Sequence, residues 1–208
     1  LAGAQLTLYY DPAAHGAILA AEAGLTAELL IVRAPQPPVR TELPMTNKNG
    51  VWRARHLLPA EGQFFLLRFY SGEKEDNNGG RYWESIIYGR EMRPARGAHL
   101  QKSLLLQQGG IEGFSWRQEP GEAETELEAE LAIYPDNLEA KTALWDLLLR
   151  RYPLASTRTR VRNELRQVYE NAGGDEEILA ALLPFFFRTG QEYIARQIIA
   201  ERLEQGVQ

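Results

Sequence analysis

Hydrophobic residues follow two different periods along the chain, and the change falls near residue 110. Between residues 5 and 88, apolar and polar positions alternate in short runs separated by glycine, proline and asparagine. After residue 120, apolar residues recur at helical spacing in segments of about fifteen residues. Alternating runs followed by helical segments predict an α+β chain of two domains, in which a small β domain precedes a helical array.

Short alternating runs in the first block are predicted as strands. The predicted strands are Gln5–Tyr10, Thr26–Arg33, Val39–Leu43, Val51–Leu58, Gln63–Tyr70 and Tyr82–Tyr88. Thr26–Arg33 is apolar almost throughout, which indicates a central strand covered on both faces. Asn49-Gly50 is typical of a hairpin turn, because both residue types tolerate a positive φ. The pattern predicts an immunoglobulin-like β-sandwich over residues 1–97.

The second block is predicted to form helical hairpins over residues 120–208. The predicted helices are Glu122–Ile133, Leu138–Arg151, Thr157–Ala172, Glu176–Arg188 and Gln191–Gln205. Asp136, Thr157 and Asp175 stand where N-caps are expected, because their side chains can accept hydrogen bonds from the first turn. Glycines at 109, 110 and 113 indicate a linker between the two domains, which covers residues 98–119 and begins with a short helix on the edge of the sandwich.

Composition narrows the classes of function. The 208 residues are 44% hydrophobic and 25% charged, as in ordinary globular proteins, and the net charge of -5 gives no electrostatic basis for binding nucleic acid. No apolar run reaches the ~18 residues that predict a membrane-spanning helix. The chain has no cysteine, which excludes disulfides, thiolate metal sites and cysteine nucleophiles. The start Leu1-Ala2-Gly3-Ala4 resembles the end of a signal peptide and predicts a secreted or periplasmic protein, although it is also compatible with an arbitrary domain boundary.

Residues with catalytic chemistry are scattered. His15, His56 and His99 fall in three separate elements, with no partner at metal-ligand spacing, and His56 fits a half-buried strand position. The alternating glutamates between Glu122 and Glu130 are interpreted as a solvated helix start. We therefore predict no catalytic, cofactor or metal site, and hence a protein that is not an enzyme. Calcium binding at the oxygen-rich loop 73–78 remains open beside the simpler interpretation as a hairpin tip.

Aromatic residues supply the remaining candidates. Trp52, Tyr82 and Trp83 could stack on a sugar, but Trp83 is predicted to face away from Tyr82, which favours core positions for some of these rings. The run Phe185-Phe186-Phe187 cannot be buried by a single helical stripe. One of these phenylalanines is therefore expected to meet a neighbouring element or a partner.

The first block resembles early-set immunoglobulin-like modules, which include carbohydrate-binding modules beside starch-acting enzymes. The resemblance rests on Met45-Thr46, Asn49-Gly50-Val51-Trp52, Leu58-Pro59 and the apolar strand Phe64–Phe69. The order of parts, with Asp76-Asn77-Asn78-Gly79-Gly80 before Tyr82 and Tyr88, also resembles the N-terminal half of bacterial secreted proteins that carry a thioredoxin-like domain further along. That resemblance implies a non-catalytic portion of a longer polypeptide.

The second block resembles tetratricopeptide-like repeats. The residues that carry the resemblance are Leu182, Phe186, Gly190, Ala195 and Ile199, with Tyr134-Pro135-Asp136 as an inter-repeat stop. Arg202 stands where the family has a small residue, Pro184 interrupts a helix, and the spacing from Asp136 to Asp175 exceeds the usual repeat. In such arrays the first helices of the hairpins line a concave face.

The candidate partner-binding residues on this face are Lys141, Asp146, Arg150, Glu177, Phe187 and Arg188. The sequence thus predicts a non-enzymatic, secreted or periplasmic protein-interaction or structural module. Its partner would be another protein, a further domain of the same polypeptide or a second copy in a homo-oligomer. The alternative to a binding surface is that the two hairpins only brace the sandwich. The alternative function is a carbohydrate-binding module, accessory to a glycoside-active enzyme, that uses Trp52, Tyr82 and Trp83.

Overall fold

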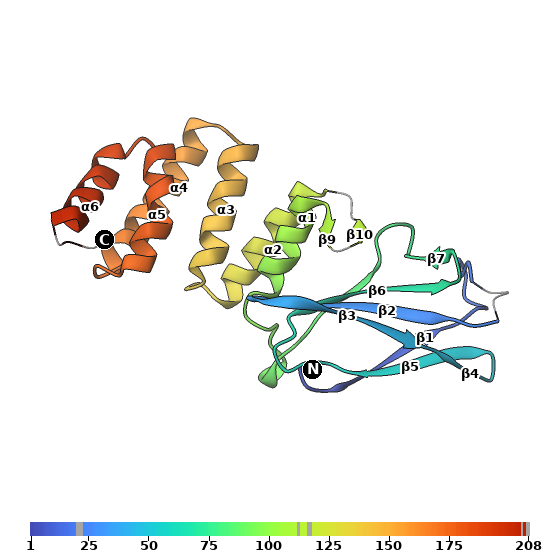
Figure 1. Cartoon of the computed structure of the whole chain (residues 1–208). Coiled ribbons are helices and arrows are strands. Elements are labelled where there is room, and N and C mark those ends of the chain that lie inside the picture. Colours follow the sequence, from blue (N-terminus) through green and yellow to red (C-terminus); the bar gives the residue numbers. More distant parts are fainter. Residues whose placement is uncertain (20–22, 112, 116–117, 205, 207–208) are drawn as a thin grey trace. The chain divides into compact units, whose positions relative to one another are not determined.

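The computed structural model describes residues 1–19, 23–111, 113–115, 118–204 and 206, and the chain divides into two compact units (Figure 1). The first unit, Leu1–Tyr134, contains antiparallel sheets followed by two helices, and the second, Pro135–Gln208, contains four helices. This arrangement confirms the predicted α+β chain, in which a β domain precedes a helical array.

Two antiparallel sheets form most of the first unit. The first sheet has the order β1-β5-β4, with β1 at Gln5–Tyr10, β5 at Val51–Leu57 and β4 at Thr46–Lys48. The second has the order β3-β2-β6-β7, with β3 at Gln36–Pro44, β2 at Thr26–Arg33, β6 at Phe64–Ser71 and β7 at Lys74–Asp76. Strand β8, at Trp83–Ile86, also pairs with β6, and a 3-10 turn follows at Arg90–Met92.

The sheets share one hydrophobic core, as expected for sandwich-like packing. β1 and β5 are paired from Gln5 opposite Leu57 to Tyr10 opposite Trp52, so alternate residues of each strand point inward. The buried residues at the centre of this core are Leu8, Tyr10, Ala27, Leu29, Ile31, Ala54, Phe65, Leu67 and Phe69. They come from both sheets, so the alternation read from the sequence identified the correct inner faces.

Strand β2 is buried on its other face as well, which confirms the prediction of a central strand. Leu30 and Val32 belong to a second core with Leu66 of β6, Leu105 and Phe114. Leu105 belongs to helix α1, at Ala98–Gln108. Phe114 belongs to the two-residue strand β10, at Phe114–Ser115, which pairs with strand β9, at Gly110–Ile111. The short helix after the sandwich therefore covers a sheet face rather than an edge.

Helix α2, at Pro120–Ile133, packs against α1 and belongs to the first unit. The glycines predict a linker over residues 98–119 and a helical domain over residues 120–208. The first compact unit of the structure extends to Tyr134 and includes both α1 and α2. Of the predicted linker, residue 112 and residues 116–117 lie outside the described part of the chain.

The second unit is a stack of four helices, α3 at Leu138–Arg151, α4 at Ala155–Asn171, α5 at Glu176–Arg188 and α6 at Glu192–Glu204. Helix α3 contacts α4 and α5, and α5 contacts α4 and α6. The shared core includes Trp145, Leu165, Leu182, Phe186 and Ile198, at least one residue from each helix. The helical spacing read from the sequence therefore marks the buried stripes of this unit.

The helix starts are partly as predicted. Asp175 caps α5, because its carboxylate accepts hydrogen bonds from the backbone N–H groups of Glu177 and Ile178, at 2.9 and 3.1 Å. The prediction for α3 is wrong by one residue, since the side chain of Asn137, rather than Asp136, accepts from Ala140 N. Thr157 lies inside α4, which begins at Ala155.

Candidate functional site

One face of α5 is left uncovered in the helical unit. The helix buries Leu182, Phe185 and Phe186, whereas Phe187 is 45% exposed. One stripe of a helix cannot take three successive aromatic rings, because each residue is turned about 100° from the one before it. The exposed side chains Glu177, Ala180, Pro184 and Phe187, spaced three or four residues apart, share the face that points away from the core.

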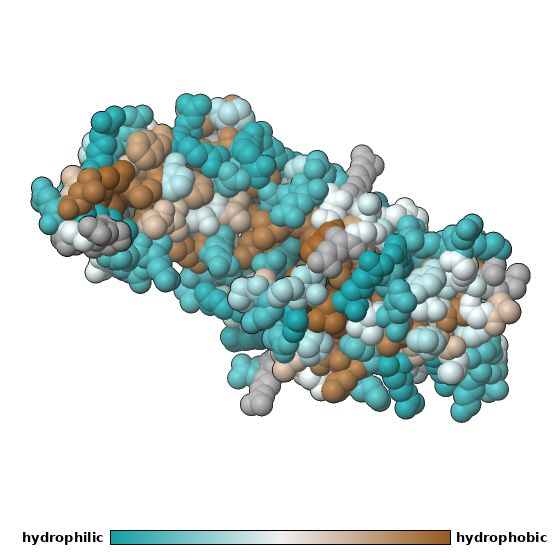
Figure 2. Space-filling model, viewed as in Figure 1, coloured by the Kyte–Doolittle hydropathy of each residue, from teal (hydrophilic) through white to brown (hydrophobic). Residues whose placement is uncertain are grey.

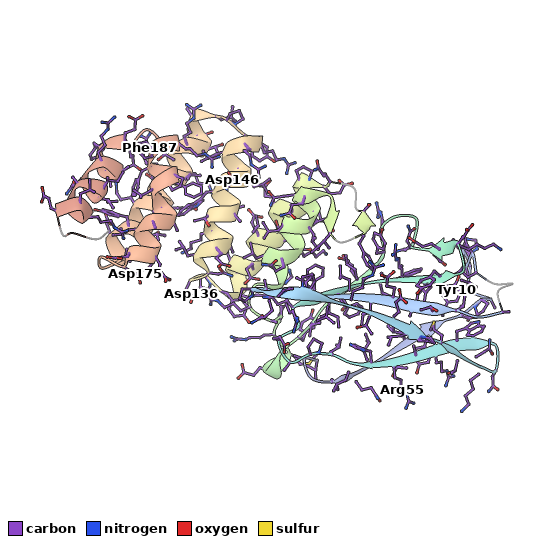
Figure 3. All side chains as sticks on the ribbon, viewed as in Figure 1. Tyr10, Arg55, Asp136, Asp146, Asp175 and Phe187 are labelled. Atoms are coloured by element: carbon purple, nitrogen blue, oxygen red, sulfur yellow. The ribbon has the colours of Figure 1, made fainter. Side chains whose placement is uncertain are left out.

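An ion-pair cluster joins the last turn of α5 to α3. Asp146 of α3 accepts from Arg150, one turn later in the same helix, at 2.8 Å, and from Arg188 of α5 at 2.7 Å. The Arg188 guanidinium also lies over the ring of Phe185, 5.5 Å from its centroid. We call the surface formed by Asp146, Arg150, Phe187 and Arg188 the α3–α5 face; Figure 3 labels Asp146 and Phe187 on it.

Two further residues predicted for this surface lie elsewhere. Lys141 precedes Asp146 by five residues and is therefore turned about 140° around α3 from it. Glu177 shares the exposed stripe of α5, but it lies in the first turn, about 16 Å along the helix from Arg188. Of the six predicted residues, the structure pairs Asp146 with Arg150 and Arg188, and Phe187 directly precedes Arg188 in α5.

The three aromatic residues proposed for sugar stacking do not form one exposed platform. Tyr82 is buried in the core beneath α1 and packs on Phe114, with ring centroids 4.9 Å apart. Trp52 and Trp83 are partly buried and pack against the core between the sheets. The sequence predicted that Tyr82 and Trp83 face opposite sides of their strand. In the structure their rings lie in two different cores.

A charged cluster inside the first unit was missed by the sequence analysis. The ammonium of Lys102 on α1 lies 2.8 Å from a carboxylate oxygen of Glu84 on β8 and 2.8 Å from one of Glu126 on α2. His99 Nδ1 lies 2.6 Å from the other oxygen of Glu126. These four side chains join α1 and α2 to the sheet and are mostly buried.

Burial and pairing compete in this cluster. Burial raises the pKa of Glu84 above its usual range, and the contact with Lys102 only partly offsets this. Burial would also raise the pKa of Glu126, but the hydrogen bonds from His99 and Lys102 outweigh this effect and lower the pKa. Burial would lower the pKa of Lys102, yet its contacts with Glu126 and Glu84 raise it. The cluster is therefore held together by a cation between two carboxylates.

The alternating glutamates of α2 are not all solvated, so that interpretation is wrong for two of them. Glu126 belongs to the cluster with Lys102, and Glu130 is fully buried and accepts a hydrogen bond from Gly97 N at 2.7 Å. Glutamates four residues apart share one helix face, and this face is turned to α1. The four-residue spacing could have shown that Glu126 and Glu130 share a face. It could not have identified their partners, which lie 24 to 33 residues away in sequence.

The other titratable predictions are placed as follows. His56 is half-buried on β5, and burial lowers its pKa. In the oxygen-rich loop 73–78, Glu75 binds Arg68 at 2.9 Å and Asp76 accepts from the Tyr10 hydroxyl at 2.8 Å. Within the described residues, no group of three His, Asp or Glu side chains is arranged to hold a metal ion.

Among the residues that the structure describes, every helix is too short or too polar to cross a bilayer. No protein-family model matches the chain, and neither a curated protein nor a solved structure shows a significant match to it.

Proposed function

We propose that this chain is a non-enzymatic interaction module of a secreted or periplasmic protein, and that the α3–α5 face binds a segment of a protein partner. The observation that carries the proposal is the ring of Phe187, which is 45% exposed one residue before Arg188, and Arg188 and Arg150 both pair with Asp146. Aromatic residues and arginines are enriched at protein interfaces, where a few residues supply most of the binding energy.

The helix contacts support a tetratricopeptide-like arrangement as part of this proposal. In such arrays, the first helix of each hairpin touches the first helix of the next, and these helices line the binding surface. Here α3 and α5 are the first helices of two hairpins and contact one another, while α4 lies against both. The exposed stripe of α5 and the ion pairs of α3 fall on these first helices.

The partner we propose is a polar segment that carries an apolar side chain and an acidic group. The apolar side chain would cover Phe187, and the acidic group would compete with Asp146 for Arg150 or Arg188. For the first unit we propose an immunoglobulin-like class, supported by two facing antiparallel sheets with one core between them. A carbohydrate-binding role has less support, because Tyr82 is buried away from Trp52 and Trp83.

Replacing Phe187 with serine should weaken partner binding by about tenfold or more, because the truncation removes a central aromatic contact worth at least about 1.4 kcal/mol. The measurement is a quantitative pull-down from extract of the source organism, followed by titration of the retained protein. Leu57→Ser is the matched control, since Leu57 is 67% exposed on strand β5. If both variants retain the partner equally, the α3–α5 face is not the binding surface.

A further inference from the structure

A large cavity opens in the first unit, where the two sheets are not joined. Among the described strands, β1 pairs only with β5, and β8 pairs only with β6, so each has one unpaired side here. The cavity between them has a volume of about 890 Å³. Pockets that hold small organic ligands fall in the range of about 300 to 1,000 Å³.

Aromatic rings form the inner wall of this cavity. Phe69 of β6 packs on Tyr10, with ring centroids 4.9 Å apart, and on Trp83, with centroids 5.1 Å apart. All three residues line the cavity, together with the apolar side chains of Phe65 and Leu67. Electron-rich ring faces attract a cation, and this cation–π interaction is strongest for Trp, followed by Tyr and Phe.

A buried carboxylate lies within the same wall. Asp76 is only 6% exposed, and its Oδ2 accepts from the Tyr10 hydroxyl at 2.8 Å. That hydroxyl accepts from Leu19 N at 3.0 Å, so its proton points to Asp76. Oδ1 accepts from Asn78 N at 3.3 Å. Because a carboxylate has about four acceptor positions, Asp76 keeps the capacity for one or two more hydrogen bonds.

The charges around the cavity have one sign. Asp11 and Asp76 line it, whereas the described lining residues include neither lysine nor arginine and only one histidine, His15. Glu84 also borders it, but its carboxylate is turned to Lys102 of α1 and is already paired. A buried carboxylate is costly without a cation nearby, so this environment complements a positively charged ligand.

We propose that this cavity binds a small organic cation, an amine or quaternary ammonium with an aromatic or branched aliphatic body. The charged head would lie against Asp76 and the face of Trp83, and the apolar body would fill the space lined by Phe65, Leu67 and Phe69. This site lies in the first unit and is independent of the binding surface proposed for the helices.

The test is titration of the full chain with phenethylammonium, followed by calorimetry and by backbone amide chemical shifts. The matched neutral probe is 2-phenylethanol, and the anionic probe is phenylacetate. We expect phenethylammonium to bind about tenfold or more tightly than 2-phenylethanol, because only the cation gains the contacts with Asp76 and the rings. Shifts should fall on residues of β1, β6 and β8.

Asp76→Asn keeps an acceptor for Tyr10 but removes the charge, so it should abolish the preference for the cation. Asp146→Asn, in the second unit, is the matched control and should leave the preference unchanged. If Asp76→Asn fails to fold, Trp83→Leu serves in its place and should weaken cation binding by about fivefold or more. Equal binding of the cation and the alcohol, or no binding of the cation up to about 10 mM, would overturn the proposal. Binding of neutral oligosaccharides alone would instead assign the cavity to a sugar.

Discussion

Replacing Trp145 with alanine should lower the free energy of unfolding of the second unit by about 4 kcal/mol. Trp145 is fully buried at the centre of this unit and packs edge-to-face on Phe185, with centroids 5.4 Å apart. Its indole N–H also donates to Glu164 at 2.7 Å. The truncation removes the largest side chain of this core and leaves a cavity, because the surrounding helices can close only part of the space.

The measurement is chemical denaturation of the full chain, with hydrogen exchange of the α3–α6 amides to assign the transition to this unit. Trp145→Phe should cost clearly less, because it keeps an aromatic ring in the core and Glu164 still pairs with Arg160 at 3.0 Å. The matched surface control is Tyr193→Ala, expected within about 0.5 kcal/mol, since Tyr193 is exposed. Equal losses for Trp145→Ala and Tyr193→Ala would contradict the core described here.

Replacing Lys102 with methionine should lower the free energy of unfolding of the first unit by about 3 kcal/mol at neutral pH. Methionine keeps much of the volume but leaves the carboxylates of Glu84 and Glu126 without the ammonium that lies 2.8 Å from each. Lys102 is 13% exposed, so water can replace the lost partner only poorly. Lys48→Met on β4 is the matched control, because Lys48 is exposed.

The loss at Lys102 should depend on pH in a defined direction. Burial already raises the pKa of Glu84, and without the ammonium that pKa rises further above its unfolded value. A carboxylate whose folded pKa is raised contributes stability at low pH and loses it as the pH rises through the folded pKa. The variant should therefore approach the wild type as the pH falls toward about 4. A loss that is independent of pH, or equal to that of Lys48→Met, would contradict the cluster.

The regular elements could be predicted because one consistent hydrophobic pattern runs through each of them. Gln5–Tyr10 and Thr26–Arg33 are strands with the predicted bounds, and Leu138–Arg151 and Glu176–Arg188 are helices with the predicted bounds. The segment that follows the sandwich was harder, because the two-residue strands β9 and β10 are too short to show an alternation. Its glycines suggested a linker, whereas Phe114 is in fact buried against the sheet.

The candidate sites were predictable only where they depend on local spacing. The exposure of one phenylalanine in the run 185–187 follows from helix geometry alone, and Phe187 is the exposed one. The contact between Lys102 and Glu84, and the cavity with Asp76 and Tyr10, depend on which strands and helices become neighbours. Strand order is not encoded in periodicity, so no pattern in the chain placed these side chains together.

The most direct test of the proposed interaction function is site-specific photo-cross-linking in the full chain. A photoreactive phenylalanine derivative is placed at Phe187 in one sample and at Leu57 in another, and each is irradiated in extract of the source organism. Our account predicts a discrete protein adduct at residue 187 and none at residue 57. An excess of unlabelled wild-type chain should suppress the adduct at residue 187, whereas an excess of the Phe187→Ser chain should not. A suppressible adduct at residue 57 with none at residue 187 would contradict it.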